Sequence, residues 1–577
     1  NTDLPENPEK VGEVEEQMQY AAPRDKEMYE DHYSEVSDLS LPKIKGGIVP
    51  HHLVAGKLIA NWFENITKQK PKNIVILSPD HFARGRSEVS TSLLNWDSVY
   101  GKVEVNKIVI EKLLNNKLIN INDEALSEEH GIYSLVNYLA KSSPKTKLIP
   151  LILRNDLTNE EMDSLVLDLK NILPKDTVIL SSIDFSHYQT LPVANYHDEY
   201  SLDVIKNFSF EQLENLEIDS IPSLYILLRL MENYNTQKLV HFEHSNTATI
   251  SGLLRQKETT SHHSMYFAEG EKEEDSVVSM LFFGDMMLDR SVKNKIDKNG
   301  ADYIFKELAG EENRFFRSAD IIHANLEGPF ANYRRETSKE IAFRFDPILI
   351  PTLVKYNFNI FTLANNHSLD MSSKGFQESK DNLDKNRIEY YGQQFGIGDE
   401  TVLLKEINDY KFAFVGLNDT NQPINIEGVK NLISDLKEKN DFVIINIHWG
   451  EEYKVLSSNP RQQLLGHNLV DAGADLIIGH HPHVIQEMEV YNNVPIFYSL
   501  GNFVFDQYFS EPIQKSLAIG TIFYQDKLSL HVFPLQSINS QASLIDYDEA
   551  KNILNEFIDK SRLNTYTFNS FNLIINK

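Results

Sequence analysis

Short apolar runs alternate with longer amphipathic stretches along most of this 577-residue chain, and this alternation constrains the fold more than any other feature. The apolar runs have the length of buried strands. In the first half they are Ile74–Leu77, Leu148–Leu153 and Val178–Leu180. The stretches between them, Lys102–Asn115, Asn159–Ile172 and Asp198–Phe208, predict helices. The alternation predicts an α/β layer architecture.

The pattern occurs twice, separated by one charged segment. It runs from residue 41 to 269, and it resumes at Val277–Phe283 after the run Glu269–Asp275 (EGEKEED). A charged run with one glycine is typical of a linker. At about 100–200 residues per domain, the length also requires at least two cores. We expect two tandem α/β domains, over 41–269 and 276–577, the second ending in a C-terminal tail, with a linker at 270–275.

Residues 1–40 have a different composition. They contain twelve acidic and three basic side chains with few aliphatic ones. Such a stretch cannot bury enough apolar surface to offset the entropy of ordering it alone. We interpret it as an acidic arm, either a tether or a segment laid over another surface.

Composition excludes several classes of function. The net charge of −28 argues against general nucleic-acid binding, which depends on cationic contacts to phosphate. With no cysteine, disulfides, thiolate nucleophiles and cysteine-based metal sites are excluded. No run approaches the about 18 apolar residues of a membrane-spanning helix. Because the sequence starts at Asn1 without a signal peptide, we expect an exported protein, extracellular or at the cell surface, with a cytoplasmic location left open.

In the second half, polar residues follow the predicted strands where each strand ends. In open α/β sheets, ligands bind outside the carboxyl ends of the strands, so these residues should converge. Their oxygen and imidazole donors suit a pair of divalent ions, of which Mn, Fe, Mg and Zn are not distinguishable. The expected ligands are Asp285, Glu327, Asn366, His448, His481 and His483. His367 follows a ligand directly and is our candidate general acid.

Taken singly, these motifs also have structural interpretations. A Gly-Asp after a strand is usually a turn, and Asn-Asn-His is mostly a loop or a helix cap. Gly-His-His-Pro-His at 479–483 is more specific, because three imidazoles within four residues bring little structural benefit. The whole set in this order is hard to explain by packing.

The motif order resembles the calcineurin-like metallophosphoesterases and, more closely, the CapA family associated with capsular poly-γ-glutamate synthesis. The similarity covers roughly residues 276–560. The matching motifs are Gly284–Leu288, Asn325–Glu327, Asn365–Asp370, His448–Gly450, Gly479–His483 and Ser499–Phe503. One departure is Met287, where a phosphoesterase has a histidine ligand, and it puts simple phosphatase activity in doubt.

This resemblance implies a four-layer α/β/β/α sandwich and a metal-dependent hydrolase or transferase that acts on an anionic polymer or phosphoester. Arg334, Arg335, Lys339 and Arg344 could meet these anions, or they could belong to a solvated basic loop. Arg344 and Asn502 are our candidate substrate contacts.

The first half also places acids and imidazoles at strand ends. His51 follows a short apolar entry, Asp80-His81 ends one strand and Ser181–His187 ends another. Glu129-His130 and Glu243-His244 add two acid–imidazole pairs. A histidine and a carboxylate at successive strand ends suit a mononuclear non-haem iron or similar site, with other groups left for proton transfer.

Here the sequence resembles the Memo-like proteins, also called AmmeMemoRadiSam system protein B, which are related in fold to class III extradiol dioxygenases. The resemblance implies one iron or copper ion bound by two histidines and a cysteine. His51 and His81 take the histidine positions, with Asp184 and His187 beside them as catalytic candidates. The cysteine is lost, and Glu243 or His244 is our candidate replacement.

Three hypotheses follow. The first is a surface-attached metalloprotein whose CapA-like half acts on a poly-γ-glutamate-like exopolymer. The second is a non-enzymatic surface protein built from two enzyme-derived folds, which self-associates through residues 1–40. The third is that the Memo-like half alone is catalytic, as an oxygen-dependent enzyme.

Overall fold

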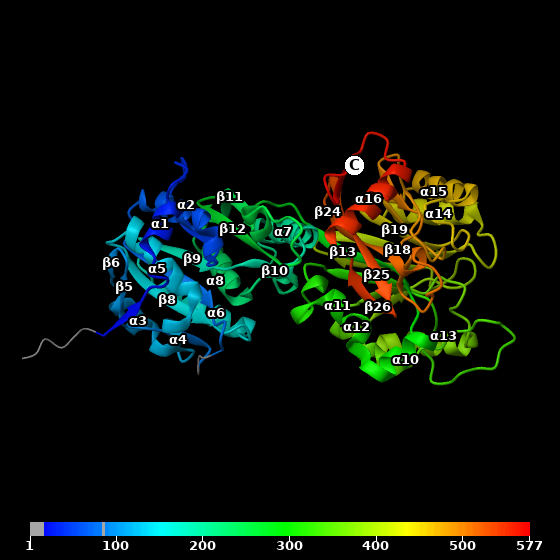
Figure 1. The fold of residues 1–577 in the computed structure, drawn as a ribbon, viewed down its shortest axis with the longest axis horizontal. Helices are drawn as coiled ribbons and strands as arrows, with labels where there is room; N and C mark the ends of the chain where they lie inside the picture. The colour runs from blue at the N-terminus through cyan, green and yellow to red at the C-terminus, as the bar shows by residue number, and fades with distance from the viewer. Residues whose placement is uncertain (1–16, 84–86) are drawn as a thin grey trace, which may run out of the picture. The chain divides into compact units, whose positions relative to one another are not determined.

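The computed structural model describes residues 17–83 and 87–577, which form two compact units (Figure 1). Among the described residues, the first unit comprises the chain up to Phe185, Ile218–Ile250 and His262–Lys272. The second comprises Ser186–Glu217, Ser251–Ser261 and Glu273–Lys577. The expected α/β class is confirmed, since both units contain mixed sheets flanked by helices.

The first unit is built on a sheet with a parallel centre. Strands β2, β9, β3 and β8 run parallel in that spatial order, with β12 antiparallel to β2 at one side and β4 antiparallel to β8 at the other. The strands of this unit are β1 (Met18–Tyr20), β2 (Ile44–Val49), β3 (Asn73–Pro79), β4 (Val89–Thr91), β5 (Asn95–Ser98), β6 (Gly101–Val103), β7 (Ile119–Ile121), β8 (Lys147–Leu153), β9 (Thr177–Ser182), β11 (Lys238–Asn246) and most of β12 (Thr259–Ala268). β2, β3 and β9 end side by side, which brings the polar residues after them to one edge of the sheet.

Several helices of the first unit have clear sequence signals at their starts, among them α6 (Asn159–Ile172). In one, Thr158 and Glu161 form a reciprocal capping box that satisfies otherwise unpaired N–H groups. The helices are α1 (Lys26–His32), α2 (Gly56–Thr67), α3 (Lys107–Leu113), α4 (Asp123–Glu128), α5 (His130–Ser142), α6 (Asn159–Ile172), α8 (Ile221–Asn233) and α9 (Thr247–Ser251).

The described part of the acidic arm packs on the first unit. β1 pairs in parallel with β5, and Tyr29 of α1 is fully buried with its ring 4.9 Å from that of Tyr138. His32 Nδ1 lies 2.6 Å from the Tyr138 hydroxyl. Residues 18–33 are therefore laid over another surface of the same chain, and residues 1–16 lie outside the described part.

The second unit contains two sheets. One has the order β16-β15-β14-β13-β24-β25-β26, with β23 on β13 and β27 on β25, and the other has the order β17-β18-β19-β20-β22-β21. The strands of the first sheet are β13 (Val278–Met286), β14 (Ile321–Leu326), β15 (Ile360–Thr362), β16 (Glu389–Tyr391), β23 (Asn502–Val504), β24 (Lys515–Phe523), β25 (Lys527–Ile538), β26 (Gln541–Leu544) and β27 (Asn572–Asn576). Those of the second are β17 (Val402–Ile407), β18 (Tyr410–Asn418), β19 (Phe442–His448), β20 (Leu476–His480), β21 (Met488–Tyr491) and β22 (Val494–Phe497).

The two sheets pack face to face over a shared apolar core. Phe282 of β13, Phe412 of β18 and Phe442 of β19 are buried in one cluster between them. The outer face of the second sheet packs on α14 and α15 through a separate cluster. Phe283 faces the other way and packs on Phe316 and Phe358. The unit is thus an α/β/β/α sandwich, whose helices are α10 (Arg290–Asn299), α11 (Lys306–Ala309), α12 (Ile350–Lys355), α13 (Ser372–Lys385), α14 (Ile426–Lys437), α15 (Pro460–Asp471) and α16 (Tyr547–Lys560).

Helix α7 (Leu191–Lys206) also belongs to the second unit, although it precedes β13 by 72 residues of chain. The Tyr200 hydroxyl of α7 donates to Asp320, just before β14, at 2.6 Å. Asp320 is half-buried and also accepts from Gln212 and Asn215. A carboxylate with several donors ties this helix to the sandwich.

None of the helices in the described ranges combines the length and apolarity needed to cross a bilayer.

Candidate metal centres

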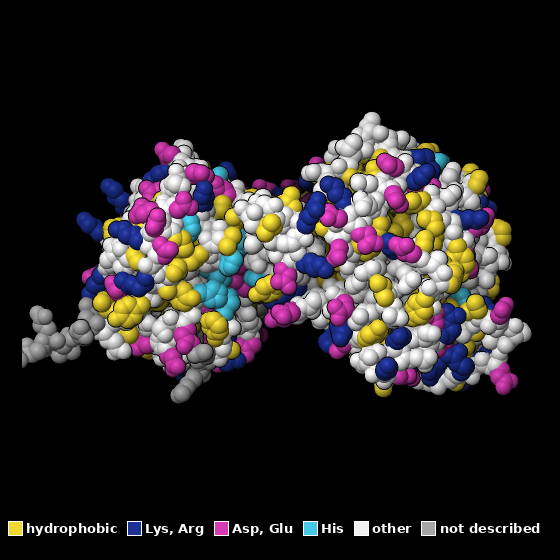
Figure 2. Space-filling view, viewed as in Figure 1, with side chains coloured by type: hydrophobic (Ala, Val, Ile, Leu, Met, Phe, Trp, Pro, Cys, Tyr) yellow, Lys and Arg dark blue, Asp and Glu magenta, His cyan; other side chains and the backbone are white. Residues whose placement is uncertain are grey.

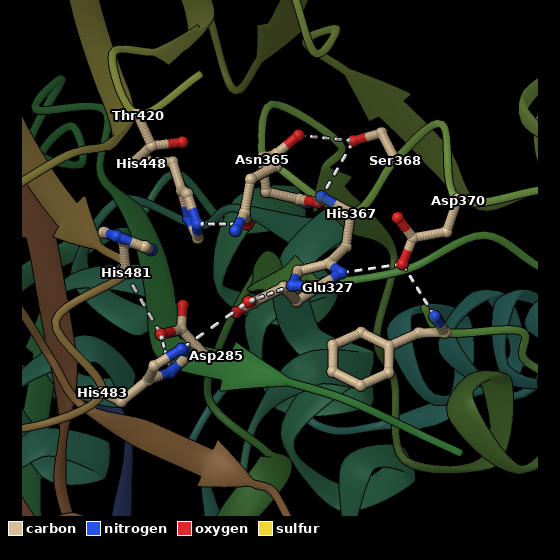
Figure 3. A network of polar contacts seen from close by, with 12 residues as sticks. Asp285, Glu327, Asn365, His367, Ser368, Asp370, Thr420, His448, His481 and His483 are labelled. Carbon is tan, nitrogen blue, oxygen red and sulfur yellow. Dashed lines mark hydrogen bonds and ion pairs between the residues drawn. The ribbon is translucent and has the colours of Figure 1, made fainter. Parts of the chain in front are cut away.

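In the second unit, acids and imidazoles from both sheets meet at one end of the sandwich (Figure 3). β13, β14 and β15 run parallel, and so do β18, β19 and β20, so each sheet ends its strands on one edge. The side chains gathered there are Asp285, Glu327, Asn366, His367, His448, His481 and His483. The structure therefore brings together the predicted ligands of the second half.

Asp285 is fully buried at the end of β13 and has a donor at each oxygen. Asn325 donates to Oδ1 at 2.8 Å, and His483 Nδ1 lies 3.2 Å from Oδ2. His480 Nδ1 lies 3.4 Å from Oδ1. Burial alone would raise the pKa of Asp285, but the contacts with His480 and His483 lower it well below its usual range. The Asp285 carboxylate is therefore ionised although it is fully buried.

Glu327, directly after β14, is also fully buried, but neither of its carboxylate oxygens makes a hydrogen bond within the described structure. The nearest imidazole nitrogens are His367 Nε2 and His483 Nε2, each 3.8 Å from its Oε1. Burial and the negative charge of Asp285 raise the pKa of Glu327 well above its usual value. Buried carboxylates are normally hydrogen-bonded, paired or bound to metal, so a cation closer than His483 would suit this side chain.

Two groups of ligand atoms lie close enough to share an ion. Oxygen and nitrogen atoms of Asp285, Glu327 and His448 lie within 4.8 Å of one another, and so do those of Glu452, His481 and His483. Asn366 adds Oδ1, 3.0 Å from His448 Nε2. Glu452 was missed by the sequence prediction. Its only signal is a second acid after the His-Trp-Gly motif at 448–450.

Two of the three histidines of the Gly-His-His-Pro-His motif are held in opposite protonation states. Burial, followed by the charge of His483, lowers the pKa of His481 to about 3. Burial also acts against protonation of His483, but Glu327 and Asp285 raise its pKa to about 9. The proton on His483 occupies the position of a cation between two carboxylates, and a divalent ion can replace it.

His367 is oriented by residues behind it. Its Nδ1 lies 2.7 Å from Asp370 Oδ2, and Asp370 also pairs with Lys339 at 2.6 Å. The Phe343 ring packs against the imidazole with centroids 4.2 Å apart. Nε2 is thus the nitrogen that faces Glu327. Burial lowers the pKa of His367 despite the opposing effect of Asp370.

The residues expected to contact substrate differ in whether they already have protein partners. Arg334 pairs with Asp289, and Lys339 pairs with Asp370, so both cations already have protein partners. Arg344 is half-buried, its Nη1 lies 3.6 Å from Asp346, and its Nε is buried without a hydrogen bond in the described structure. Asn502 is buried, and its Oδ1 lies 2.9 Å from His483 Nδ1, where it orients that ring. The Met287 side chain is fully buried.

The first unit carries a second cluster, and Figure 2 shows histidine side chains gathered on its surface. His51 follows β2, His81 follows β3 and Asp184 follows β9. Atoms of His51, Asp184 and Asp219 lie within 4.8 Å of one another, as do those of His51, His81 and His130. The structure thus assembles His51, His81 and Asp184 as expected and adds His130 and Asp219.

The electrostatics of this cluster also favour a cation. Burial opposes protonation of His81, but Asp219 and Glu129 raise its pKa to about 10. His130 stacks on His81 at 4.0 Å between centroids, and burial together with the neighbouring histidines lowers its pKa to about 4. At neutral pH the site holds one proton on His81 and a neutral His130.

Three predicted residues of the first half do not join this cluster. Glu243 accepts two hydrogen bonds from the Asn61 amide, at 2.8 and 3.0 Å. His244 is exposed, with its ring beside that of His263. His187 belongs to the second unit, where its Nδ1 lies 3.6 Å from Glu217. Asp219 was missed because a single acid in a turn before a helix gives no distinctive signal.

Two families match this chain, one to each half. Residues 19–257 match the family described as Memo-like protein, and residues 279–507 match the family described as bacterial capsule synthesis protein PGA_cap. The expected combination of a Memo-like and a CapA-like part is thereby confirmed.

Relatives of each half are known. The PGA biosynthesis protein CapA of Bacillus subtilis is 34% identical over 251 residues, covering 40% of this chain and 64% of that protein. A MEMO1 family protein of Nitrosopumilus maritimus is 26% identical over 173 residues, covering 29% of this chain and 63% of that protein. The chain spans less than two thirds of the length of each. A solved structure titled a novel phosphatase, from Mycoplasma pneumoniae, is similar at a TM-score of 0.27 and 14% identity, covering 46% of this chain and 91% of that one, which supports no conclusion about activity.

Proposed function

We propose that this protein, in which a Memo-like part precedes a PGA_cap part, is a metal-dependent hydrolase or transferase of exopolymer metabolism at the cell surface. Its second unit would carry the activity, and its substrate would be an anionic polymer of the poly-γ-glutamate kind. The capsule-related relatives support the substrate class. The cluster around Glu327 supports the metal dependence.

One observation carries the proposal. The Glu327 carboxylate is fully buried and makes no hydrogen bond in the described structure, while Asp285 and His448 lie within ligand distance of it. An uncompensated buried carboxylate costs several kcal/mol unless a cation or a proton balances it. If Glu327 had only a structural role, we would expect a hydrogen-bond donor beside it, as Asn325 is beside Asp285. The absence of such a donor favours a metal site.

The donor set suits two divalent ions. One would be held by Asp285, Glu327, His448 and Asn366, and the other by His481, His483 and the exposed Glu452. Oxygen and imidazole donors suit Mn, Fe, Zn or Mg. When bound, such ions supply Lewis-acid polarisation of the bond to be cleaved.

The protein's own side chains provide the proton transfer and the recognition of charge. Asp370 holds Nδ1 of His367, so Nε2 exchanges a proton with a bound molecule. Phe343 packs on His367, and the adjacent Arg344 has a buried Nε free to donate. A guanidinium there would bind a carboxylate of the polymer.

The test combines metal analysis with turnover. The full chain is stripped, reloaded with Mn²⁺ or Zn²⁺ and assayed on poly-γ-glutamate and on phosphodiesters. We expect His481→Ala to lose bound metal and activity together, and Glu451→Gln, an exposed neighbour, to keep both. Full activity of His481→Ala, or no activity of the loaded wild type on either substrate, would contradict the proposal.

A further inference from the structure

We infer that the first unit holds one divalent cation between His51, His81 and Asp219, so that an aspartate supplies the anionic ligand that this cysteine-free chain lacks. This site lies in the other unit from the proposed hydrolase centre and goes beyond it.

The ligand atoms converge on a common point. Asp219 Oδ2 lies 3.3 Å from His51 Nε2 and 3.6 Å from His81 Nε2. Asp184 Oδ2 lies 3.3 Å from His51 Nε2 as well. Two imidazole nitrogens and two carboxylate oxygens therefore face one another. The His51 and His81 rings lie at 81° to each other, so they approach from different directions.

The hydrogen bonds on the far sides of both rings determine what faces inward. The Ser182 hydroxyl donates to the Gly131 carbonyl at 2.7 Å, so at His51 Nδ1, 3.1 Å away, it accepts the N–H. His51 Nε2 then faces two carboxylates at 3.3 Å, in the position from which all three groups could bind one cation.

His81 repeats this arrangement. Its Nδ1 donates to Glu129 Oε1 at 2.7 Å, and Glu129 also accepts from the backbone N–H groups of His81 and Gly131. A histidine whose Nδ1 donates to a carboxylate while Nε2 faces inward is the usual arrangement of a metal ligand. Both imidazoles turn Nε2 inward, but Nδ1 bonds to the Ser182 hydroxyl at His51 and to the Glu129 carboxylate at His81.

Asp219 is held in place by the fold. The backbone N–H of Asp184 donates to Asp219 Oδ2 at 3.1 Å. Asp219 stands just before Ser220, which caps α8, so the start of a helix fixes its position. Asp184 is fixed in turn by His262, whose Nδ1 lies 2.9 Å from Oδ1.

The donor types indicate which ions fit. Two imidazoles with one or two carboxylates suit Fe²⁺, Mn²⁺ or Zn²⁺, whereas copper(I) favours thiolate and thioether ligands. The iron alternative of our sequence-based expectation is therefore favoured over reduced copper. The third ligand is Asp219 in place of Glu243 or His244.

The experiment measures metal binding to the full chain. Stripped wild type, Asp219→Asn and Glu243→Gln are titrated with Zn²⁺ and Mn²⁺ by calorimetry, and bound metal is counted by elemental analysis after desalting. We expect Asp219→Asn to lose one ion per chain, or to bind it more than about 10–100-fold more weakly, the loss typical even of partners behind a ligand. Glu243→Gln should match the wild type.

Two further variants keep the result interpretable. Asp219→Glu should restore part of the affinity if the carboxylate is the ligand, and circular dichroism of each variant reports its folding. In a His481→Ala background, the Asp219→Asn loss should persist, because the two sites are separate. Wild-type affinity in folded Asp219→Asn, or the same loss in Glu243→Gln, would overturn the inference without affecting the second-unit proposal.

Discussion

The variant Glu327→Gln should be more stable than the wild type without metal and less stable than the wild type with metal. The change replaces an ionisable carboxyl group that is fully buried and has no hydrogen-bond donor in the described structure. Leaving a buried polar group unsatisfied costs about 1–3 kcal/mol, and more when it is charged. In EDTA we therefore expect Glu327→Gln to be more stable than the wild type by about 1–3 kcal/mol.

With saturating metal the order should reverse. A ligand at 100 times its dissociation constant stabilises the folded state by about 2.7 kcal/mol. The wild type gains this free energy, whereas the variant loses a ligand and gains much less. At roughly 2–4 °C per kcal/mol, both differences are measurable by calorimetry of the second unit's transition.

The pH dependence has a definite sign. The pKa of Glu327 is raised in the folded state, so the folded protein holds a proton that the unfolded chain releases above its usual value of 4.5. Stability of the metal-free wild type then falls as pH rises from 4.5 through the raised pKa, and the advantage of Glu327→Gln grows over the same range.

Glu451→Gln is the matched control, because that side chain is exposed. A Glu327→Gln variant less stable than the wild type in EDTA, or one that gains as much stability from Mn²⁺, would refute the reasoning.

Two further predictions concern the same centre. His367→Asn should lower kcat by about 10²–10⁴-fold, the range for a general acid or base, with bound metal unchanged by elemental analysis; loss of metal instead would make His367 a ligand. Gly284→Ala should destabilise the second unit, because a Cβ there would lie 1.9 Å from the Gly501 carbonyl oxygen. Overpacking of this kind costs about 1–3 kcal/mol of unfolding free energy. An unchanged denaturant midpoint would contradict the close approach of these two segments.

Strand positions were predictable from apolar runs alone. β3 extends the predicted Ile74–Leu77 by one residue at its start and two at its end, and α6 matches Asn159–Ile172 in full. Helix α3 was predicted too long, because residues 101–103 form β6 and Asn106 caps a helix that starts at Lys107. Because apolar and polar residues alternate on both sides of Asn106, the sequence pattern did not show where the strand ends and the helix begins.

The convergence of the candidate ligands in the second unit was predictable because each follows a strand within a recognisable motif. Glu452 and Asp219 were not, since each is an isolated acid whose relevance depends on which strands lie side by side. Asn502 was expected at the substrate, and its position behind His483 depends on the pairing of β23 with β13. Such relations are set by tertiary packing, which no local pattern reports.

The Tyr200–Asp320 contact has a consequence for how this gene can be divided. A polypeptide started at residue 276 would lack α7, so Asp320 would lose Tyr200 as a donor and the apolar surface that Tyr196 covers at Phe533 would face water. Such a fragment should aggregate or be degraded. A recombination event within Glu269–Asp275 would separate α7 from the sandwich it packs on. We therefore expect the two halves to be inherited together as one gene.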